Sequence, residues 1–147
     1  GFSREDFARS HPGGILGRRL LVYVSDIMHT GDDMPLVNRD ASLIAALDEM
    51  SSKGLGMTGI LDDEGCLVGI YTDGDLRRSL NHGVDIQRST ISKVMVTEPR
   101  TTKAGALAAE VVEVMRLHSI NGLFAVDAED RPVGALNALD LIRAGIF

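Results

Sequence analysis

Apolar residues recur at three- and four-residue intervals in two stretches of the chain, and this spacing predicts two amphipathic helices. In the first helix, expected over 43–52, one face carries Leu43, Ala46, Leu47 and Met50. In the second helix, expected over 105–117, the matching face carries Leu107, Val111, Val114 and Met115. Two repeats this short cannot bury so much apolar surface, so we expect these helices to support self-association as a homodimer.

Each of these helices is followed by two short apolar runs that flank a polar turn, which is the pattern of a β-hairpin. The expected strands are 57–61, 66–72, 122–126 and 132–137, and the turns are 62–65 and 127–131. A further helix follows each hairpin, over 75–83 and 138–145, and both stop at a glycine. With a short strand at the start, each half therefore reads strand, helix, strand, strand, helix.

The two halves are copies related by an almost constant shift. Residues 40–50 align with 105–115, and the same shift of 65 positions carries Asp62 onto Asp127 and Asp75 onto Asp140. Further upstream, "VSDIM" at 24–28 matches "ISKVM" 67 positions later, so the first copy has two additional residues, which a loop accommodates most easily.

A single copy has too small a core to be stable alone. The repeats therefore predict an α/β (α+β) fold in which two β-α-β-β-α units, 23–83 and 84–147, pack as a pseudo-symmetric pair. Gly69 and Gly134 lie at matching strand positions, where a glycine marks the close approach of another backbone or of a ligand. Met50, Met57 and Met115 are expected to fill the core.

Composition and charge exclude several classes of function. The net charge of -6 and the pI near 5.1 argue against nucleic acid and anionic lipid as partners. Cys66 is the only cysteine, which excludes an internal disulfide and a multi-cysteine metal cage and fits a reducing compartment. The four histidines have no ligand spacing, so we predict no metal site. No apolar run is long enough to span a membrane, and the start of the chain lacks a signal-peptide pattern, so we expect a cytoplasmic protein.

The same motif, G-x-x-[T/N]-x-x-D, occurs in both copies where the third strand runs into the last helix. Its residues are Gly69, Thr72 and Asp75 in the first copy and Gly134, Asn137 and Asp140 in the second. With this motif, the tandem over 24–145 resembles a pair of CBS domains. The resemblance implies a cleft between the repeats that binds a nucleotide, regulation of an attached enzyme or transporter, and dimers formed by stacking.

The motif has two interpretations, a helix cap and a nucleotide-binding site, and they do not exclude each other. Thr72 with Asp75, and Asn137 with Asp140, have the spacing of a helix N-cap and its capping box. The same geometry suits a nucleotide, because a helix N-terminus attracts phosphate and a carboxylate accepts hydrogen bonds from a ribose diol. We expect the site with Thr72 to be the better one, since Asn137 offers a donor of a different shape.

Secondary candidates follow from their positions in the repeat. Thr30 and Thr97 are expected just after the first strand of each copy, and Arg100 and Lys103 could neutralise phosphate. For each of them a solvated surface residue is the simpler interpretation. Arg77 and Arg78 are likewise expected on an exposed basic helix face.

The first 22 residues lie outside the repeats. Their "SHPGG", followed by Leu16-Gly17-Arg18, resembles the C-terminal end of a sugar-isomerase (SIS) domain of the arabinose 5-phosphate isomerase family, which serves the Kdo branch of lipopolysaccharide synthesis. In that family, His11 would be an acid or base of the isomerisation. Here we expect the catalytic half to be missing. We therefore favour a structural reading, in which Ser3 and Asp6 cap a short helix and His11 lies in the break that follows.

These observations predict a non-catalytic CBS pair of an arabinose 5-phosphate isomerase, without a cofactor, that senses a nucleotide and self-associates. The two ligand classes left open are an adenine nucleotide and the nucleotide-sugar CMP-Kdo. The alternatives are a purely structural dimerisation module, a CBS adenylate sensor of another sugar-phosphate enzyme, and a hidden enzyme. A homodimer is expected for this chain, and a tetramer is allowed for the full-length enzyme.

Overall fold

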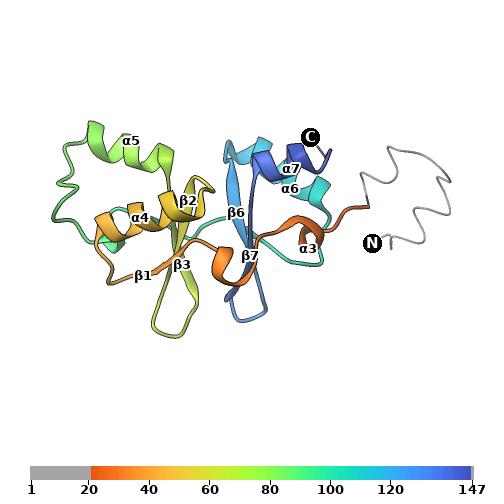
Figure 1. The fold of residues 1–147 in the computed structure, drawn as a ribbon, viewed down its shortest axis with the longest axis horizontal. Helices are drawn as coiled ribbons and strands as arrows, with labels where there is room; N and C mark the ends of the chain where they lie inside the picture. Colours follow the sequence, from red (N-terminus) through yellow and green to blue (C-terminus); the bar gives the residue numbers. More distant parts are fainter. Residues whose placement is uncertain (1–20, 147) are drawn as a thin grey trace.

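The computed structural model describes residues 21–146, which form two small β-sheets covered by helices (Figure 1). The first sheet has the order β1-β2-β3-β4, with β1 Leu36–Asn38, β2 Met57–Leu61, β3 Leu67–Thr72 and β4 Val96–Thr97. The second sheet has the order β5-β6-β7, with β5 Thr101–Thr102, β6 Gly122–Val126 and β7 Pro132–Asn137. The helices are α3 Val24–Ile27, α4 Leu43–Lys53, α5 Asp73–Asn81, α6 Ala108–His118 and α7 Ala138–Arg143, with 3-10 turns at Gly31–Asp33 and Ile91–Lys93. The predicted mixed α/β fold is confirmed.

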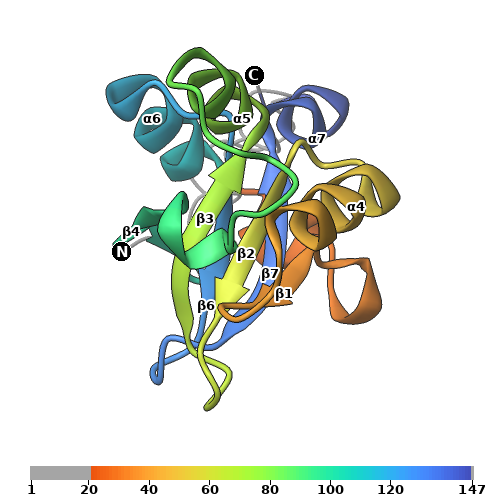
Figure 2. The same ribbon diagram turned by 90° about the vertical axis from the view of Figure 1, so that its left-hand side faces the viewer.

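The two sheets repeat each other in pairing and register. β1 and β5 run parallel to β2 and β6, and each of these then pairs with an antiparallel neighbour, β3 or β7. Both hairpins have an irregularity at the same place, after Ile60 in the first and after Ala125 in the second. The helices gather at one end of the strands, and the two hairpin turns extend from the other end (Figures 1 and 2).

The helix ends also match between the copies. α4 begins after Ser42, whose hydroxyl accepts a hydrogen bond from the Ala45 N–H, and it ends at Gly54 in the left-handed conformation. α6 ends in the same conformation at Ser119, 65 positions later, although Ser119 is not a glycine. The backbone therefore follows the repeat even where the residue type departs from it.

The opening segments, 24–28 and 91–95, are short helical turns, and the short first strand expected in each half is β1 in the first and β5 in the second. The Met28 N–H donates to the Val24 carbonyl at 2.9 Å, and the Met95 N–H donates to the Ile91 carbonyl at 2.9 Å. Val24 and Met28 are four residues apart, so one helical turn directs both toward the core. Thr30 consequently precedes β1, and Thr97 lies within β4, so neither follows a first strand.

Each opening segment packs against the opposite repeat. Val24 lies in a core cluster with Val111 and Leu136 of the second repeat, and α3 accordingly lies on the side of that repeat (Figure 1). Ile91 lies in the cluster of Leu43 and Tyr71 of the first repeat. The strand pairing is exchanged in the same way, since β4 pairs with β3 and His29 forms a bridge with Ala135 of β7. The sequence boundaries 23–83 and 84–147 stay a prediction. In space, each opening segment packs with the repeat to which it does not belong in sequence.

A third core cluster joins the two sheets. Its buried members come from both hairpins and are Met57, Leu67, Ile70, Phe124, Val126 and Ala135. The predicted packing of the repeats as a pair is therefore present, and Met50, Met57 and Met115 are all buried as expected.

The two matching strand glycines make room for methionines of the exchanged segments. A Cβ on Gly69 would lie 2.5 Å from the Met95 sulfur, and a Cβ on Gly134 would collide with the Met28 side chain. The close approach predicted at these glycines is therefore made by Met95 and Met28, with the Val96 carbonyl beside Gly69.

The exposed apolar surface differs from the expectation for the two long helices. α4 buries its apolar face through Leu43, Ala46 and Met50. In the described part of the chain, the large exposed apolar side chains are Leu80 on α5, Leu117 on α6, Leu139 and Ile142 on α7, and Val96 on β4. The expectation was therefore wrong for α4, because the hairpin and the 84–94 segment cover that face. Among residues 21–146, no helix combines the length and apolar character needed to cross a bilayer.

Candidate ligand-binding cleft

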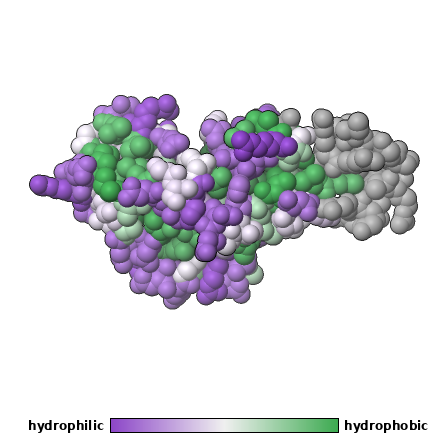
Figure 3. All heavy atoms as spheres, in the orientation of Figure 1, coloured by the Kyte–Doolittle hydropathy of each residue, from purple (hydrophilic) through white to green (hydrophobic). Residues whose placement is uncertain are grey.

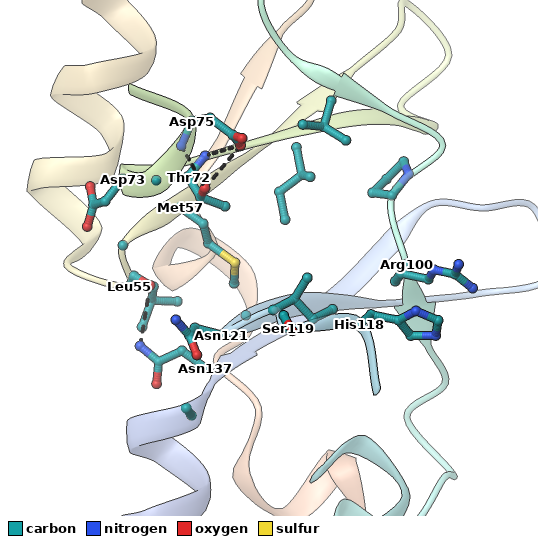
Figure 4. A pocket seen from close by; sticks show the side chains of 18 of the residues that line it. Leu55, Met57, Thr72, Asp73, Asp75, Arg100, His118, Ser119, Asn121 and Asn137 are labelled. Atoms are coloured by element: carbon teal, nitrogen blue, oxygen red, sulfur yellow. Dashed lines mark hydrogen bonds between the residues drawn. The ribbon is translucent and has the colours of Figure 1, made fainter. Parts of the chain in front are cut away.

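A cleft of about 690 Å³ opens between the two repeats, at the end of the strands where the helices gather. In the space-filling view, the surface is hollowed on this side between the two halves (Figure 3). One wall holds the end of β3 and the first turn of α5, with Thr72 and Asp75 (Figure 4). The facing wall holds the end of α6 and the start of α7, with His118, Asn121 and Asn137 (Figure 4).

The first turn of α5 forms the capping box that the sequence predicts. The Thr72 hydroxyl accepts a hydrogen bond from the Asp75 N–H at 3.2 Å. In return, Asp75 Oδ2 accepts from the Thr72 N–H and from the Thr72 hydroxyl, each at 3.0 Å. Asp75 is buried, with 8% of its surface exposed, so this network orders the helix start under the cleft.

Arg78 occupies the other oxygen of the same carboxylate. Its Nη2 lies 2.6 Å from Asp75 Oδ1, in an ion pair whose arginine side chain is 61% exposed. Arg77 and Arg78 both line the cleft. Both are exposed, as expected. The exposed helix face that carries them forms part of the cleft wall.

The second repeat has the same capping box but different partners. Asn137 Oδ1 accepts from the Asp140 N–H at 2.9 Å, and Asp140 Oδ2 accepts from the Asn137 N–H at 2.9 Å. The Asn137 Nδ2 donates to the Leu55 carbonyl at 3.3 Å, which ties α7 to the loop before β2. Asp140 Oδ1 lies 2.9 Å from the Nε2 of His29.

The two carboxylates are therefore held in different ways. His29 reaches Asp140 because the exchanged opening segment brings it beside β7. The matching position 67 residues later is Val96, whose apolar side chain cannot bond to Asp75. Asp75 is paired instead with an arginine of its own helix.

The lining of the cleft includes both charged and apolar side chains. Cationic side chains at its wall are Arg77, Arg78 and Arg100, and acidic ones are Asp73, Asp75 and Glu98. Its apolar lining is Leu55, Met57, Ile70, Val96, Ile120 and Leu139. A ligand with a flat apolar part and an anionic group matches this lining.

Four of the predicted binding residues line the cleft, namely Thr72, Asp75, Asn137 and Arg100. Asp140, Thr30, Thr97 and Lys103 are not among its lining residues. Lys103 instead donates to the Asp127 carbonyl at 3.1 Å, at the second hairpin turn. His11 and the Ser3–Asp6 cap lie outside the described residues.

Several lining residues were missed by the sequence reasoning. Arg78 could have been found, because it lies three residues after Asp75 on the predicted helix and so faces the same side. His118 and Asn121 could not, because they correspond to Lys53 and Gly56 in the first copy and the repeat pattern gives no signal at either position. Their place on the facing wall follows from how the two repeats pack.

Below the capping box, the Tyr71 hydroxyl is hydrogen-bonded to the Ser79 hydroxyl at 2.8 Å, and both side chains are buried. Burial raises the pKa of Tyr71 above its ordinary value, the Asp75 carboxylate raises it further, and the bond to Ser79 partly offsets these effects. The phenol therefore stays neutral and supports the start of α5 from beneath.

At the first hairpin turn, the ligand atoms of Asp62, Glu64 and Cys66 lie within 4.8 Å of one another. Asp62 Oδ1 already accepts hydrogen bonds from the Glu64 and Cys66 N–H groups. Desolvation and the Asp62 carboxylate raise the pKa of the Cys66 thiol, which disfavours the thiolate that a metal requires. The absence of a metal site stays a prediction.

Comparison with known families shows that the model of the CBS domain matches residues 24–82 and 91–146. The chain is 56% identical over 147 residues to the arabinose 5-phosphate isomerase KdsD of Pseudomonas aeruginosa, covering all of this chain and 45% of that protein. It is 48% identical over 146 residues to KdsD of Escherichia coli K12, covering 99% of this chain and 44% of that protein. The chain thus spans less than half the length of these relatives.

Solved structures with the same fold are CBS domain pairs. The CBS pair of protein MJ0100, crystallised with 5'-methylthioadenosine and S-adenosyl-L-methionine, has a TM-score of 0.75 at 24% identity, over 83% of this chain and 94% of that one. CBSX2 in complex with AMP has a TM-score of 0.73 at 21% identity, over 85% of this chain and 96% of that one. At these identities the likeness establishes the fold.

Proposed function

Because the chain belongs to the CBS domain family, we propose that it is the regulatory region of an arabinose 5-phosphate isomerase and binds a nucleotide or nucleotide-sugar between its repeats. The observation that carries this proposal is the cleft of about 690 Å³ in which Thr72 and Asp75 face Asn137 (Figure 4). Relatives named as this isomerase at 56% and 48% identity support the assignment to that enzyme.

The chemistry of the cleft supports a nucleotide as the ligand. The first turn of α5 offers the positive end of a nine-residue helix, and Arg77, Arg78 and Arg100 add cations for a phosphate. Asp75 provides a carboxylate for the hydroxyls of a ribose, and the apolar lining provides a surface for a base. AMP, the ligand of the structural neighbour CBSX2, belongs to this class.

Two ligand classes fit the proposed place in metabolism. An adenine nucleotide would report the energy state of the cell, and CMP-Kdo would report the output of the Kdo branch that feeds lipopolysaccharide synthesis. The ligand is proposed as an effector, and the cytoplasm is the location that it implies.

We assign the chemistry of the isomerase to the part of the longer protein that this chain does not cover. In support, the chain covers 45% of the Pseudomonas aeruginosa enzyme and matches the model of the CBS domain, and the Asp75 carboxylate of its cleft is engaged by Thr72 and Arg78. The chain alone should not interconvert ribulose 5-phosphate and arabinose 5-phosphate. Turnover by the purified chain would contradict this assignment.

Calorimetric titration of the chain with AMP, ADP, ATP, S-adenosyl-L-methionine, CMP and CMP-Kdo tests the ligand proposal. We expect saturable binding of at least one of them and competition among those that share the cleft. If none binds at millimolar concentration, the cleft is not a nucleotide site.

The second candidate function is a structural dimerisation module without a ligand. The exposed Leu80, Leu117 and Ile142, on the helices α5, α6 and α7, favour it, because a partner chain could bury them. Self-association of this chain as a homodimer, and as a tetramer in the longer protein, is compatible with either function. The titration separates the two, because a purely structural module binds none of the nucleotides.

A further inference from the structure

We propose that Arg78 determines which class of ligand the cleft binds. When a nucleotide enters, the Arg78 side chain breaks its ion pair with Asp75 and pairs with the phosphate of the nucleotide instead. The cleft then selects phosphorylated ligands and rejects neutral nucleosides. This inference rests on the proposed function of the same cleft and adds the basis of its selectivity.

The Asp75 carboxylate has only one oxygen that a ligand could use. Oδ2 accepts two hydrogen bonds from Thr72, through the backbone N–H and the hydroxyl, and these bonds hold the start of α5. Oδ1 is covered by Arg78 Nη2 at 2.6 Å. Oδ1 therefore keeps one acceptor position beside Arg78, and a ribose diol, which donates two hydrogen bonds, can bind there with both hydroxyls only if Arg78 moves aside.

Arg78 is free to move while Asp75 is not. The arginine side chain is 61% exposed and the aspartate side chain is 9% exposed. Both guanidinium Nη atoms lie 3.3 to 3.6 Å from the point where a Cβ on Gly74 would be. The cation thus lies over the first turn of α5, at the wall of the cleft, and the missing side chain of Gly74 gives it that place.

Arg78 regains an ion-pair partner after leaving Asp75 only when the ligand is an anion. A neutral ligand with a ribose diol would separate the cation from a buried carboxylate and give the cation nothing in return. A phosphate accepts the guanidinium in a charge-assisted, bidentate hydrogen bond and so replaces the lost partner. The same movement uncovers Oδ1 for the ribose, so that both ends of a nucleotide gain contacts from one rotation of Arg78.

The second repeat lacks this arrangement although it has the same residue types. Arg143 stands at the position of Arg78, 65 residues later. Asp140 is bonded to His29, and within residues 21–146 Arg143 has no ion-pair partner and is not part of the cleft wall. Arg143 is therefore a matched control: it has the same charge and place on its helix, without the ion pair.

The test is a pair of calorimetric titrations, AMP against adenosine and CMP against cytidine, on the chain and on its Arg78→Gln and Arg143→Gln variants. For the unaltered chain we expect the nucleotide to bind at least about tenfold more tightly than its nucleoside. In Arg78→Gln, the nucleotide should bind about tenfold more weakly and the nucleoside more tightly, so that the ratio of nucleotide affinity to nucleoside affinity falls toward one. Arg143→Gln should leave both affinities unchanged.

The gain in nucleoside affinity is the result that carries the inference. If Arg78→Gln weakens the nucleotide without strengthening the nucleoside, Arg78 is a simple phosphate contact and the exchange is wrong. An unchanged ratio in Arg78→Gln overturns the inference while leaving the proposed function in place. If the unaltered chain binds none of the four probes, the proposed function fails and the inference fails with it. Circular dichroism of each variant verifies that it is folded.

Discussion

At the scale of single residues, two aspartates at matching positions have different environments. Asp75 and Asp140 complete the same capping box, yet an arginine of the same helix pairs with the first and a histidine from the other repeat bonds to the second. The difference follows from one substitution in the opening segments, histidine at position 29 against valine at position 96. We therefore expect the two repeats to differ in ligand binding.

Tyr71 gives a prediction about pH. Its folded-state pKa is raised, so the contribution of the neutral phenol to stability is fully present below the unfolded pKa of about 10 and is lost as the pH rises through the folded pKa. Tyr71→Phe should lower the free energy of unfolding by about 1 kcal/mol at neutral pH, because the bond to Ser79 is lost. Urea unfolding measured from pH 7 to 11 should show the variant losing less stability above pH 10.

Tyr23, the other tyrosine of the chain, supplies the control for this measurement. A spectrophotometric titration of Tyr71→Phe should lose one tyrosine ionisation, and the ionisation that is lost should lie above the ordinary tyrosine pKa of about 10. If Tyr71→Phe and the unaltered chain lose stability equally above pH 10, the buried phenol does not control the alkaline limit.

At the scale of elements, the sequence periodicity was sufficient for the repeated hairpins and long helices. Strands 57–61, 122–126 and 132–137 occupy the predicted ranges, because each is bounded by turn residues and buried on both sides. The expected positions of Thr30 and Thr97 after a first strand were wrong, because the segments before them, 24–28 and 91–95, form short helical turns. Their exchange between repeats could not be foreseen, because it depends on contacts between distant parts of the chain.

The exchanged segments give a prediction about stability. Gly134→Ala should lower the free energy of unfolding by about 1–3 kcal/mol, because the new methyl group overlaps the Met28 side chain. Gly69→Ala should be milder, since the new methyl group meets the flexible sulfur end of Met95, whereas at Gly134 the Met28 Cβ, which side-chain rotation does not move, also lies at 2.9 Å. Urea unfolding of both variants measures the two effects.

A double-mutant cycle checks the physical cause. Met28→Ala removes the side chain that the new methyl group meets, so Gly134→Ala should be less damaging in that background. Combining Gly134→Ala with Met95→Ala, on the other glycine, should show simple additivity. Additivity in both combinations would mean that the glycine has another role.

At the scale of the whole molecule, the sequence located one wall of the cleft and, on the facing wall, Asn137 but not its neighbours. Thr72, Asp75 and Asn137 were found because capping boxes have a local signature. The facing residues His118 and Asn121 enter the cleft only through the packing of two repeats about their shared core. Local chemistry was thus predictable, and the partners brought together by folding were not.

The exposed apolar residues lead to a prediction about assembly. Leu80, Leu117 and Ile142 are more than half exposed, and we expect a second copy of the chain to cover some of them. Light scattering should give about twice the chain mass of 15.8 kDa at micromolar concentration. Replacing all three residues by aspartate should shift the chain to the monomer, and a monomer for the unaltered chain across this range would refute the dimer.

The central proposal, a nucleotide held at Thr72 and Asp75, is tested most directly by the melting temperature of Asp75→Asn with and without ligand. A nucleotide at about 100 times its Kd should stabilise the unaltered chain by about 2.7 kcal/mol, a shift of roughly 5 to 10 °C for a domain of this size. Asp75→Asn keeps the shape of the cap, so its melting temperature without ligand should fall by an amount typical of ~1 kcal/mol or less. Its ligand-induced shift should be largely lost, whereas Asp140→Asn, which lies outside the cleft wall, should retain most of it. Equal shifts in both variants, or no shift of the unaltered chain with any nucleotide at millimolar concentration, would leave Thr72 and Asp75 as a helix cap alone.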